Sequence, residues 1–282
     1  MNNEKILILG AKGMLGQQLK VIFSDYQVIA WDFEDLDITN KNDVLTKISY
    51  LSPNVVINAA AYNNVDGAED NQDTVNLLNG YAVGYLAEVA KSINALFIHY
   101  STDYIFDGEN KDGYREDSKP RSISMYGGSK LLGEEEVLKN TDKYYIIRLS
   151  RLFGKMGEGQ NVKKGFVDLM LELSDGKDNI DVINEELSAP TYAPDLAKLT
   201  KNLLENNIPY GIYHGANDGS CTWHEFACEI FKLANKDIEV VPISGEKFKR
   251  KARRPQYSVL LNTKLLKQRS WQEALKEYIN TK

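Results

Sequence analysis

The chain contains few of the residues that would point to a disulfide-linked or metal-binding protein. Its 282 residues include two cysteines, Cys221 and Cys228, and three histidines, His99, His214 and His224. Both cysteines fall in one C-terminal segment, which is typical of reduced packing residues in a cytosolic protein rather than of a disulfide framework. The histidines are scattered without a neighbouring cluster of ligands, so the sequence predicts no metal site.

Excess positive charge and long apolar runs are also missing. The formal net charge is −6 and the isoelectric point is about 5.3, which argues against nucleic acid or an anionic membrane as the main partner. No stretch approaches the apolar length of a transmembrane helix, and residues 1–5 lead straight into a strand without room for a signal peptide. These absences favour a cytoplasmic enzyme.

A glycine-rich turn near the N-terminus is typical of dinucleotide binding. Residues Lys5 to Leu9 form an apolar run that suits a strand buried on both faces, and a helical apolar period follows the turn. The glycines permit a tight turn, and the helix N-terminus offers N–H groups to a pyrophosphate. With the spacing G-x-x-G-x-x-G, the predicted cofactor loop consists of Gly10, Lys12, Gly13, Met14, Leu15 and Gly16.

Acidic residues after the second predicted strand, residues 27–31, bear on the choice of cofactor. Asp32 stands where a carboxylate could accept hydrogen bonds from the adenosine ribose. It would repel a 2′-phosphate and so favours NADH, whereas Lys12 could neutralise that phosphate. Asp37 is predicted either to cap the next segment or to reach the adenine. The sequence therefore leaves both NADH and NADPH open.

Strand and helix signals alternate along the chain. Further strands are predicted over residues 55–58, 95–100 and 143–149, and long helices over residues 73–94 and 126–139. This alternation predicts an α/β fold, a Rossmann-like doubly wound parallel sheet. We expect an NAD(P)-binding domain over residues 1–150. Residues 151–282 are expected to form mainly a smaller, partly interleaved substrate-binding lobe, mobile where glycines gather at positions 154, 157, 159 and 165.

Several predicted site residues follow the carboxyl ends of strands, where open α/β sheets bind their ligands. They are Ala59, Ala60, Ala61, Tyr62, Ser101, Thr102 and Asp103. Tyr126 and Lys130 join this rim from a helix, on one face because they are four residues apart.

The Tyr126–Lys130 pair could carry a reaction. A nearby cation favours the phenolate, so we expect Lys130 to lower the pKa of Tyr126 and to let the phenol act as a general acid or base. Reduction of a ketone also needs donors for the developing oxyanion, and Thr102 is a second candidate. Such helix pairs are usually only solvated; the upstream glycine loop favours the catalytic interpretation.

These motifs, together with Asn58–Tyr62, Ser101–Phe106 and Arg253–Pro255, resemble the extended short-chain dehydrogenases/reductases, and within them the dTDP-4-dehydrorhamnose reductase family. The resemblance runs from end to end. It implies that hydride passes from NADPH or NADH to C4 of a 4-keto sugar, giving dTDP-L-rhamnose. It further implies that Tyr126 donates the proton, Lys130 holds the nicotinamide ribose and Thr102 orients the carbonyl. Asn79 matches a helix residue that assists a proton relay.

The predicted substrate contacts are Thr102, Asp103, Tyr104, Arg151 and Arg254. Arg151 replaces an aromatic residue that the family commonly has near the sugar, which could alter sugar preference. Arg254 precedes Pro255, which fixes the backbone, and its guanidinium could grip the diphosphate bidentately. The resemblance allows a homodimer. Some relatives bind magnesium at such a contact, but no matching acidic set occurs here.

Two other functions remain open at this point. The first is an epimerase, dehydratase or other nucleotide-sugar reductase of the same fold. Dehydratases usually have Thr-Asp-Glu, whereas Tyr104 occupies the glutamate position here. The second is a non-catalytic regulatory subunit like the family branch that binds methionine adenosyltransferase. Those relatives tend to lose the Tyr/Lys pair, which this chain keeps.

Overall fold

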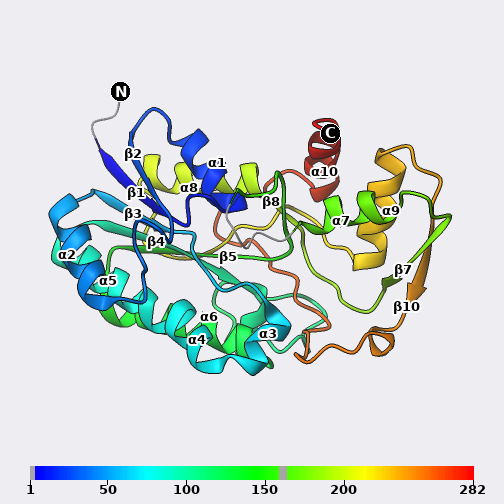
Figure 1. Cartoon of the computed structure of the whole chain (residues 1–282), viewed down its shortest axis with the longest axis horizontal. Coiled ribbons are helices and arrows are strands. Elements are labelled where there is room, and N and C mark those ends of the chain that lie inside the picture. Colours follow the sequence, from blue (N-terminus) through cyan, green and yellow to red (C-terminus); the bar gives the residue numbers. More distant parts are fainter. Residues whose placement is uncertain (1–3, 159–163) are drawn as a thin grey trace.

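The computed structural model describes residues 4–158 and 164–282, so Gly159 of the predicted glycine cluster lies outside the described residues. Its centre is a sheet of six described strands in the order β2-β1-β3-β4-β5-β9, all parallel (Figure 1). These strands are β1 Lys5–Leu9, β2 Gln27–Trp31, β3 Val55–Asn58, β4 Leu96–Thr102, β5 Tyr144–Leu149 and β9 Gly211–His214. The predicted Rossmann-like α/β fold is confirmed. The strand order reverses between β1 and β3, where such sheets bind ligands.

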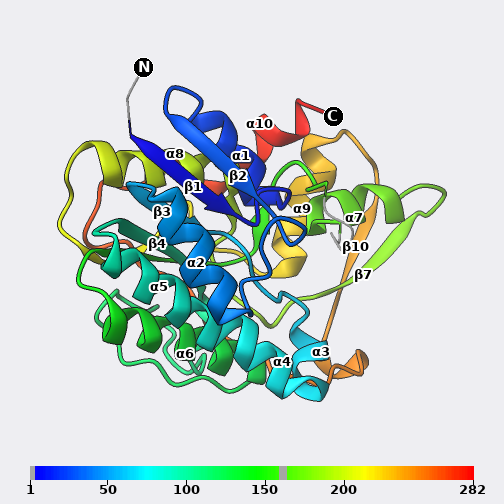
Figure 2. The same ribbon diagram turned by 60° about the vertical axis from the view of Figure 1, so that its left-hand side comes forward.

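Helices cover both faces of the sheet (Figures 1 and 2). On one face lie α1 (Met14–Ile22) and α8 (Ala193–Glu205), whose buried side chains share a core with the sheet. The opposite face is covered by α2 (Lys41–Leu51), α5 (Ala82–Ser92) and α6 (Met125–Asn140). Because both faces are covered, the central strands are apolar on both sides, as the run Lys5 to Leu9 predicted.

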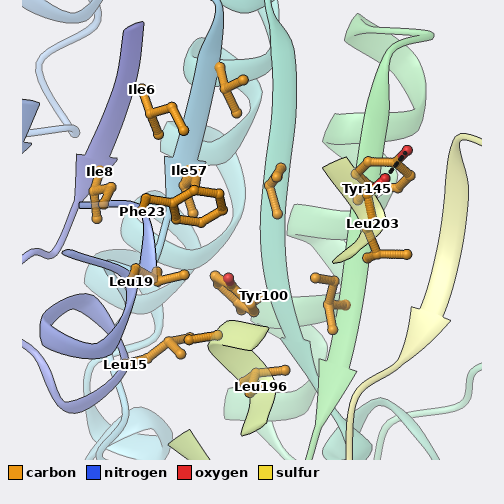
Figure 3. Close-up of a cluster of buried hydrophobic side chains, with 14 of the residues drawn as sticks. Ile6, Ile8, Leu15, Leu19, Phe23, Ile57, Tyr100, Tyr145, Leu196 and Leu203 are labelled. Carbon is orange, nitrogen blue, oxygen red and sulfur yellow. Dashed lines mark hydrogen bonds between the residues drawn. The ribbon is translucent and has the colours of Figure 1, made fainter. Parts of the chain in front are cut away.

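The packing of β1 shows how this arrangement follows from the sequence. Ile6 and Ile8 point into the core with α1 and α8, while Leu7 and Leu9 point into the core on the other face. Figure 3 shows Ile6, Ile8 and Leu19 among the side chains of the first core. All five side chains are at most 1 % exposed, and burial of each stabilises the fold by about 1.5–3 kcal/mol.

The helix predicted over residues 73–94 is divided into three parts. It begins as α4 (Gln72–Asn76), widens into a π-helical turn at Leu77–Tyr81, and continues as α5. The prediction of one continuous α-helix is therefore wrong at its centre. A side chain on Gly80 would meet that of Leu132, 2.4 Å away, so this turn lies directly against α6. Such π turns often occur at functional sites, and this one contains Asn79.

The second lobe has its own apolar core (Figure 1). Its main elements are α7 Phe166–Leu173, β7 Asn179–Ile183, α9 Trp223–Leu233, β10 Glu239–Ile243 and α10 Trp271–Ile279. Strands β7 and β10 pair in parallel, and the short strands β6 (Leu152–Phe153) and β8 (Thr191–Tyr192) pair separately.

The two parts of the molecule interleave in sequence. Strand β9 and helix α8 come from the second half of the chain but belong to the central sheet and its covering layer. In α8, Asp195 accepts hydrogen bonds from Arg269 (2.7 and 2.9 Å) and Asn217 (2.8 Å). These contacts tie α8 to the segment that leads into α10. No helix in the described part of the chain is long and apolar enough to cross a membrane.

Candidate active site

The glycine loop lies at the point where the strand order reverses. Gly10 has a φ of +73°, and a Cβ there would lie 2.6 Å from the nitrogen of Ala60. A Cβ on Gly16 would lie 2.2 Å from the carbonyl oxygen of Gly10. These close approaches explain the glycines and bring Ala59 and Ala60, at the end of β3, against the loop.

Helix α1 then begins at Met14 with Gly13 as its N-cap, and no described side chain caps that end. Its first N–H groups therefore face the position that a pyrophosphate would take in this fold. Ser101, at the end of β4, has a buried hydroxyl without a hydrogen-bond partner in the described structure. The unpaired hydroxyl and the uncapped helix both fit a bound dinucleotide.

The two acidic residues predicted to contact the cofactor differ in their surroundings. Asp32 accepts hydrogen bonds from the backbone nitrogens of Lys12 (2.8 Å) and Phe33 (2.9 Å), which fix its carboxylate at the edge of the glycine loop. Asp37 accepts from the nitrogen and hydroxyl of Thr39 at 2.9 and 2.7 Å. These bonds stabilise the turn before α2, whose N-cap is Asn40 rather than Asp37. Contact of Asp37 with the adenine stays a prediction.

A segment of the second half crosses the glycine loop. The backbone nitrogen of Glu158 donates to the carbonyl of Lys12 at 2.8 Å, and a Cβ on Gly157 would lie 2.6 Å from that oxygen. Sequence reasoning assigned Gly157 only to a mobile lobe. Position 157 requires glycine because it contacts the glycine loop, which is far away in sequence. The local spacing of residues could not have predicted that contact.

Tyr126 lies in the first turn of α6, which packs closely on the residues after β4. Ser124 caps the helix by accepting from the nitrogen of Gly127 at 3.2 Å. A Cβ on Gly127 would lie only 2.0 Å from the carbonyl oxygen of Tyr104. The rings of Tyr104 and Tyr126 meet edge to face with centroids 5.6 Å apart. The glycine after Tyr126 therefore permits the approach that places the phenol beside Tyr104.

The acidity of Tyr126 differs from the sequence prediction. Part of the Tyr126 surface is exposed, but its hydroxyl is buried. This burial is the largest influence on the pKa of Tyr126 and raises it to about 12, while a hydrogen bond with Thr102 acts in the opposite direction. The expected lowering by Lys130 is thus not found, because desolvation of the phenolate dominates and the ammonium is directed elsewhere. The phenol is therefore protonated near neutral pH, as a proton donor must be, and the raised pKa makes it a weaker acid than an ordinary tyrosine.

Lys130 is buried, with 2 % of its surface exposed, and Nζ donates to the carbonyl of Tyr100 at 2.6 Å. Nζ also lies 3.3 Å from Nε2 of His99, whose Nδ1 lies 3.3 Å from the amide nitrogen of Asn58. Burial lowers the pKa of Lys130 to about 8. Burial and then the charge of Lys130 lower the pKa of His99 well below its ordinary value, so the imidazole is neutral.

His99 therefore links the protonation of Lys130 to Asn58. A neutral imidazole accepts at one nitrogen and donates at the other, so Lys130 and Asn58 cannot both donate to it. Sequence reasoning considered His99 only as a metal ligand and missed this position. The available signal was strand register, because β3 and β4 pair Asn58 with His99.

Thr102 and Asp103 form a buried hydrogen-bonded group. The hydroxyl of Thr102 donates to Oδ1 of Asp103 at 3.1 Å, and that of Ser258 donates to Oδ2 at 2.6 Å. Burial raises the pKa of Asp103 to about 6, against the effect of Ser258. The same hydroxyl accepts from the backbone nitrogen of Tyr104 at 3.2 Å. Since Thr102 has one hydroxyl hydrogen, it cannot donate to Asp103 and to Tyr126 at the same time. Its predicted donation to a substrate carbonyl requires that hydrogen to turn away from Asp103.

Asn79 connects the π turn to the catalytic helix. Its side-chain oxygen accepts from the backbone nitrogen of Tyr62 at 2.8 Å, and its amide nitrogen donates to the carbonyl of Tyr62 and the hydroxyl of Ser129, both at 3.1 Å. Ser129 in turn donates to the carbonyl of Tyr126 at 2.7 Å. These contacts hold Tyr62 and the first turn of α6 in place; the predicted proton relay stays a prediction.

Arg151 lies between the sheet and the second lobe. Its backbone has a φ of +43°, which is unusual for a long side chain. The guanidinium stacks on the ring of Trp223 at 4.0 Å and donates to the carbonyls of Cys221 (2.8 Å) and Glu186 (2.7 Å). Its charge also acts on Asp103. This departure from the family pattern therefore acts electrostatically on Asp103, a predicted substrate contact.

Arg254 has a protein partner that sequence reasoning missed. Its two terminal nitrogens donate to the two carboxylate oxygens of Asp66, in α3 (Val65–Asp70), at 2.7 and 2.8 Å. The Arg254 hydrogen bond lowers the pKa of Asp66 well below its usual range. The bidentate fork predicted for a diphosphate thus engages a carboxylate 188 residues away in sequence. Contact with a diphosphate stays a prediction.

The site can therefore supply a protonated phenol, a buried lysine and a titratable carboxyl beside a loop suited to a dinucleotide. Among residues 4–158 and 164–282, no group of three or more His, Cys, Asp or Glu side chains could hold a metal ion. The chemistry assembled here is proton transfer next to a redox cofactor.

Comparison with known proteins agrees with this description. Residues 4–282 match the model of the RmlD substrate binding domain. The chain is 37 % identical to dTDP-4-dehydrorhamnose reductase of Aggregatibacter actinomycetemcomitans, covering 96 % of this chain and 97 % of that protein. It is 35 % identical to the spore coat polysaccharide biosynthesis protein SpsK of Bacillus subtilis, covering 98 % and 96 %. A crystal structure of dTDP-4-dehydrorhamnose reductase from Bacillus anthracis in complex with NADP superposes with a TM-score of 0.94 at 35 % identity, covering 99 % of this chain and 100 % of that one.

Proposed function

We propose that this chain, which belongs to the RmlD substrate binding domain family, reduces the C4 keto group of dTDP-4-dehydro-L-rhamnose to give dTDP-L-rhamnose. It is an NAD(P)H-dependent oxidoreductase and serves polysaccharide biosynthesis. The observation that carries the proposal is the position of Tyr126 and Thr102 together, on the sheet edge that also carries the glycine loop.

Each residue has a separate role in the proposed reaction. When bound, reduced nicotinamide supplies the hydride that adds to C4 of the sugar. Tyr126, which is protonated near neutral pH, then gives its phenolic proton to the C4 oxygen. Lys130 lies buried beside Tyr100 and His99, and we expect its amine to hold the nicotinamide ribose. Thr102 orients the carbonyl once its hydroxyl turns from Asp103.

Two arginines support the proposed binding of a charged nucleotide sugar. Arg151, stacked on Trp223, is the residue that we expect to bear on sugar preference, and Arg254 is the residue that we expect to reach the diphosphate. The Tyr104 ring packs on Tyr126 where dehydratases have glutamate, which disfavours elimination. Retention of Tyr126 and Lys130 disfavours a purely regulatory role. We expect the enzyme to work in the cytoplasm, and a homodimer is compatible with the proposal.

The test is a turnover assay with defined sugars. Purified protein is mixed with NADH or NADPH and dTDP-4-dehydro-L-rhamnose, and loss of reduced nicotinamide absorbance is followed while the sugar product is identified by NMR. Formation of dTDP-L-rhamnose is expected, and Tyr126→Phe serves as the inactive control. Absence of turnover with both nucleotides would refute the proposal, whereas reduction of only dTDP-4-keto-6-deoxy-D-glucose would reassign the sugar.

A further inference from the structure

The segment after β2 concentrates negative charge beside the glycine loop. It contains three carboxylates in four residues, Asp32, Glu34 and Asp35. Strand β2 is the edge strand next to β1, and in this fold the residue that follows it faces the hydroxyls of the adenosine ribose. NADPH carries its extra phosphate on one of those hydroxyls, with a charge of about −1.5 to −2 near neutral pH.

Hydrogen bonds hold the carboxylate of Asp32 in this position. Its Oδ2 accepts from the nitrogen of Lys12 at 2.8 Å and its Oδ1 from the nitrogen of Phe33 at 2.9 Å. Its own backbone nitrogen donates to Oδ2 of Asp35 at 2.9 Å. Each carboxylate oxygen of Asp32 has a second lone pair, so it can still accept from a ribose hydroxyl. A phosphate there would meet a fixed negative charge.

Two lysines of the described residues contact this segment, Lys12 and Lys47, and both have partners within the protein. Nζ of Lys12 lies 3.0 Å from the carboxylate of Glu34, so the charge that could neutralise a 2′-phosphate is compensated within the protein. Lys47 donates to the backbone carbonyl of Asp35 at 3.1 Å and pairs with Asp43 at 3.8 Å. The first arginine in the sequence is Arg115, far beyond this segment. The guanidinium fork that commonly accommodates a 2′-phosphate is therefore not supplied by the chain before residue 115.

We propose that Asp32, Glu34 and Asp35 make this enzyme select NADH over NADPH. The inference rests on the proposed function only in taking a nicotinamide dinucleotide as the cofactor. Asp32 accepts the 2′-hydroxyl of NADH and repels the 2′-phosphate of NADPH, while Glu34 withholds Lys12 from that phosphate. The carboxylate of Asp35 adds to the repulsion and holds the backbone of Asp32.

The test measures binding and needs no sugar. Titration of the protein with NADH and with NADPH, followed by nicotinamide fluorescence, is expected to give a dissociation constant about tenfold or more lower for NADH at low salt. The ratio should fall as salt is added, because screening weakens repulsion between exposed charges.

Two lysine variants make the test specific. Glu34→Lys releases Lys12 and adds a cation, so it should tighten NADPH binding at least several-fold and change NADH binding little. Glu239→Lys makes the same change of charge on an exposed residue of β10, in the other lobe, and should leave the ratio unaltered (Figure 1).

Equal or tighter binding of NADPH by the unmodified protein at low salt would overturn the proposal, as would an unchanged ratio in Glu34→Lys or binding of neither nucleotide. A protein that binds NADH tightly but reduces none of the sugars would refute the proposed function and leave this cofactor preference standing.

Discussion

The sheet edge proposed to bind the cofactor and the side of the molecule proposed to bind the substrate are built by different means. At the cofactor edge, glycines and backbone N–H groups determine the geometry, as at Gly10 and at Asp32. On the substrate side, long charged side chains pair with residues far away in sequence, as Arg254 does with Asp66 and Arg151 with the carbonyl of Glu186. The first kind of site depends on local chain geometry and the second on tertiary pairing.

This difference predicts which substitutions should have large effects on activity and which should have small ones. A new side chain in the tightly packed cofactor and catalytic region meets backbone atoms, which cannot yield without moving an element. Loss of a charged group on the substrate side leaves room and solvent access, so the effect should be smaller and should fall mainly on substrate binding.

The largest effect is expected at Tyr126, the proposed proton donor. Tyr126→Phe removes the phenolic hydroxyl but keeps the ring that packs on Tyr104. Turnover should fall by about 10²–10⁴, the usual contribution of a general acid. NADH binding and the unfolding temperature should stay near those of the unmodified protein. Turnover within threefold of normal, measured with saturating sugar, would remove Tyr126 from the mechanism.

A matched pair of glycines tests the packing of the catalytic helix. A Cβ on Gly127 would lie 2.0 Å from the carbonyl oxygen of Tyr104, whereas one on Gly128 meets nothing within 4 Å. Gly127→Ala should displace the first turn of α6 and lower kcat about 10²-fold, since small misplacements of catalytic groups have effects of that size. Gly128→Ala should retain activity and gain about 0.5–1 kcal/mol of helix stability. Equal activity of the two variants would contradict this account.

The buried carboxyl predicts a pH dependence of stability. Asp103 has a folded pKa of about 6 against an ordinary value of 3.8, so it binds a proton more tightly in the folded state. Its contribution to stability is present in full below about pH 4 and is lost as pH rises through 6. The difference of roughly two units corresponds to an upper value of about 3 kcal/mol.

Asp103→Asn removes this ionisation. Its free energy of unfolding, measured by urea denaturation, should therefore improve relative to the unmodified protein between pH 4 and pH 8. Ser258→Ala, which removes a donor to the carboxylate, should make the loss of stability on raising the pH steeper. A constant difference between Asp103→Asn and the unmodified protein across that pH range would show that Asp103 does not titrate there.

The smallest effect is expected on the substrate side. Arg254→Ala should raise KM for the nucleotide sugar about tenfold and lower kcat much less, because a charged contact of about 1–2 kcal/mol is lost in both ground and transition states. Asp66→Asn breaks the same ion pair but leaves the guanidinium in place. If Arg254 serves only to hold the C-terminal segment, the two variants will change KM equally; a larger effect of Arg254→Ala supports contact with the diphosphate.

Much of the fold could be predicted because its signals are local. The apolar run of β1 and the glycines after it indicated a buried strand and a tight turn, and the structure has both. The helix with Tyr126 and Lys130 was predicted within one residue of its start and end. The π turn around Asn79 could not be predicted, because its sequence has an ordinary helical period and the wider turn goes with the contact between Gly80 and Leu132.

By itself, then, the sequence determined the parallel α/β sheet, the tight glycine turn after β1 and the position of Tyr126 and Lys130 on one helix, because apolar period, glycine spacing and i,i+4 positions act over a few residues. Only the tertiary structure decided the protonation of the site. Burial raises the pKa of Tyr126, directs Lys130 to Tyr100 and His99, and brings Ser258 to Asp103 across 155 residues. Desolvation and long-range partners set these properties, and both depend on which segments pack together rather than on their spacing in the chain.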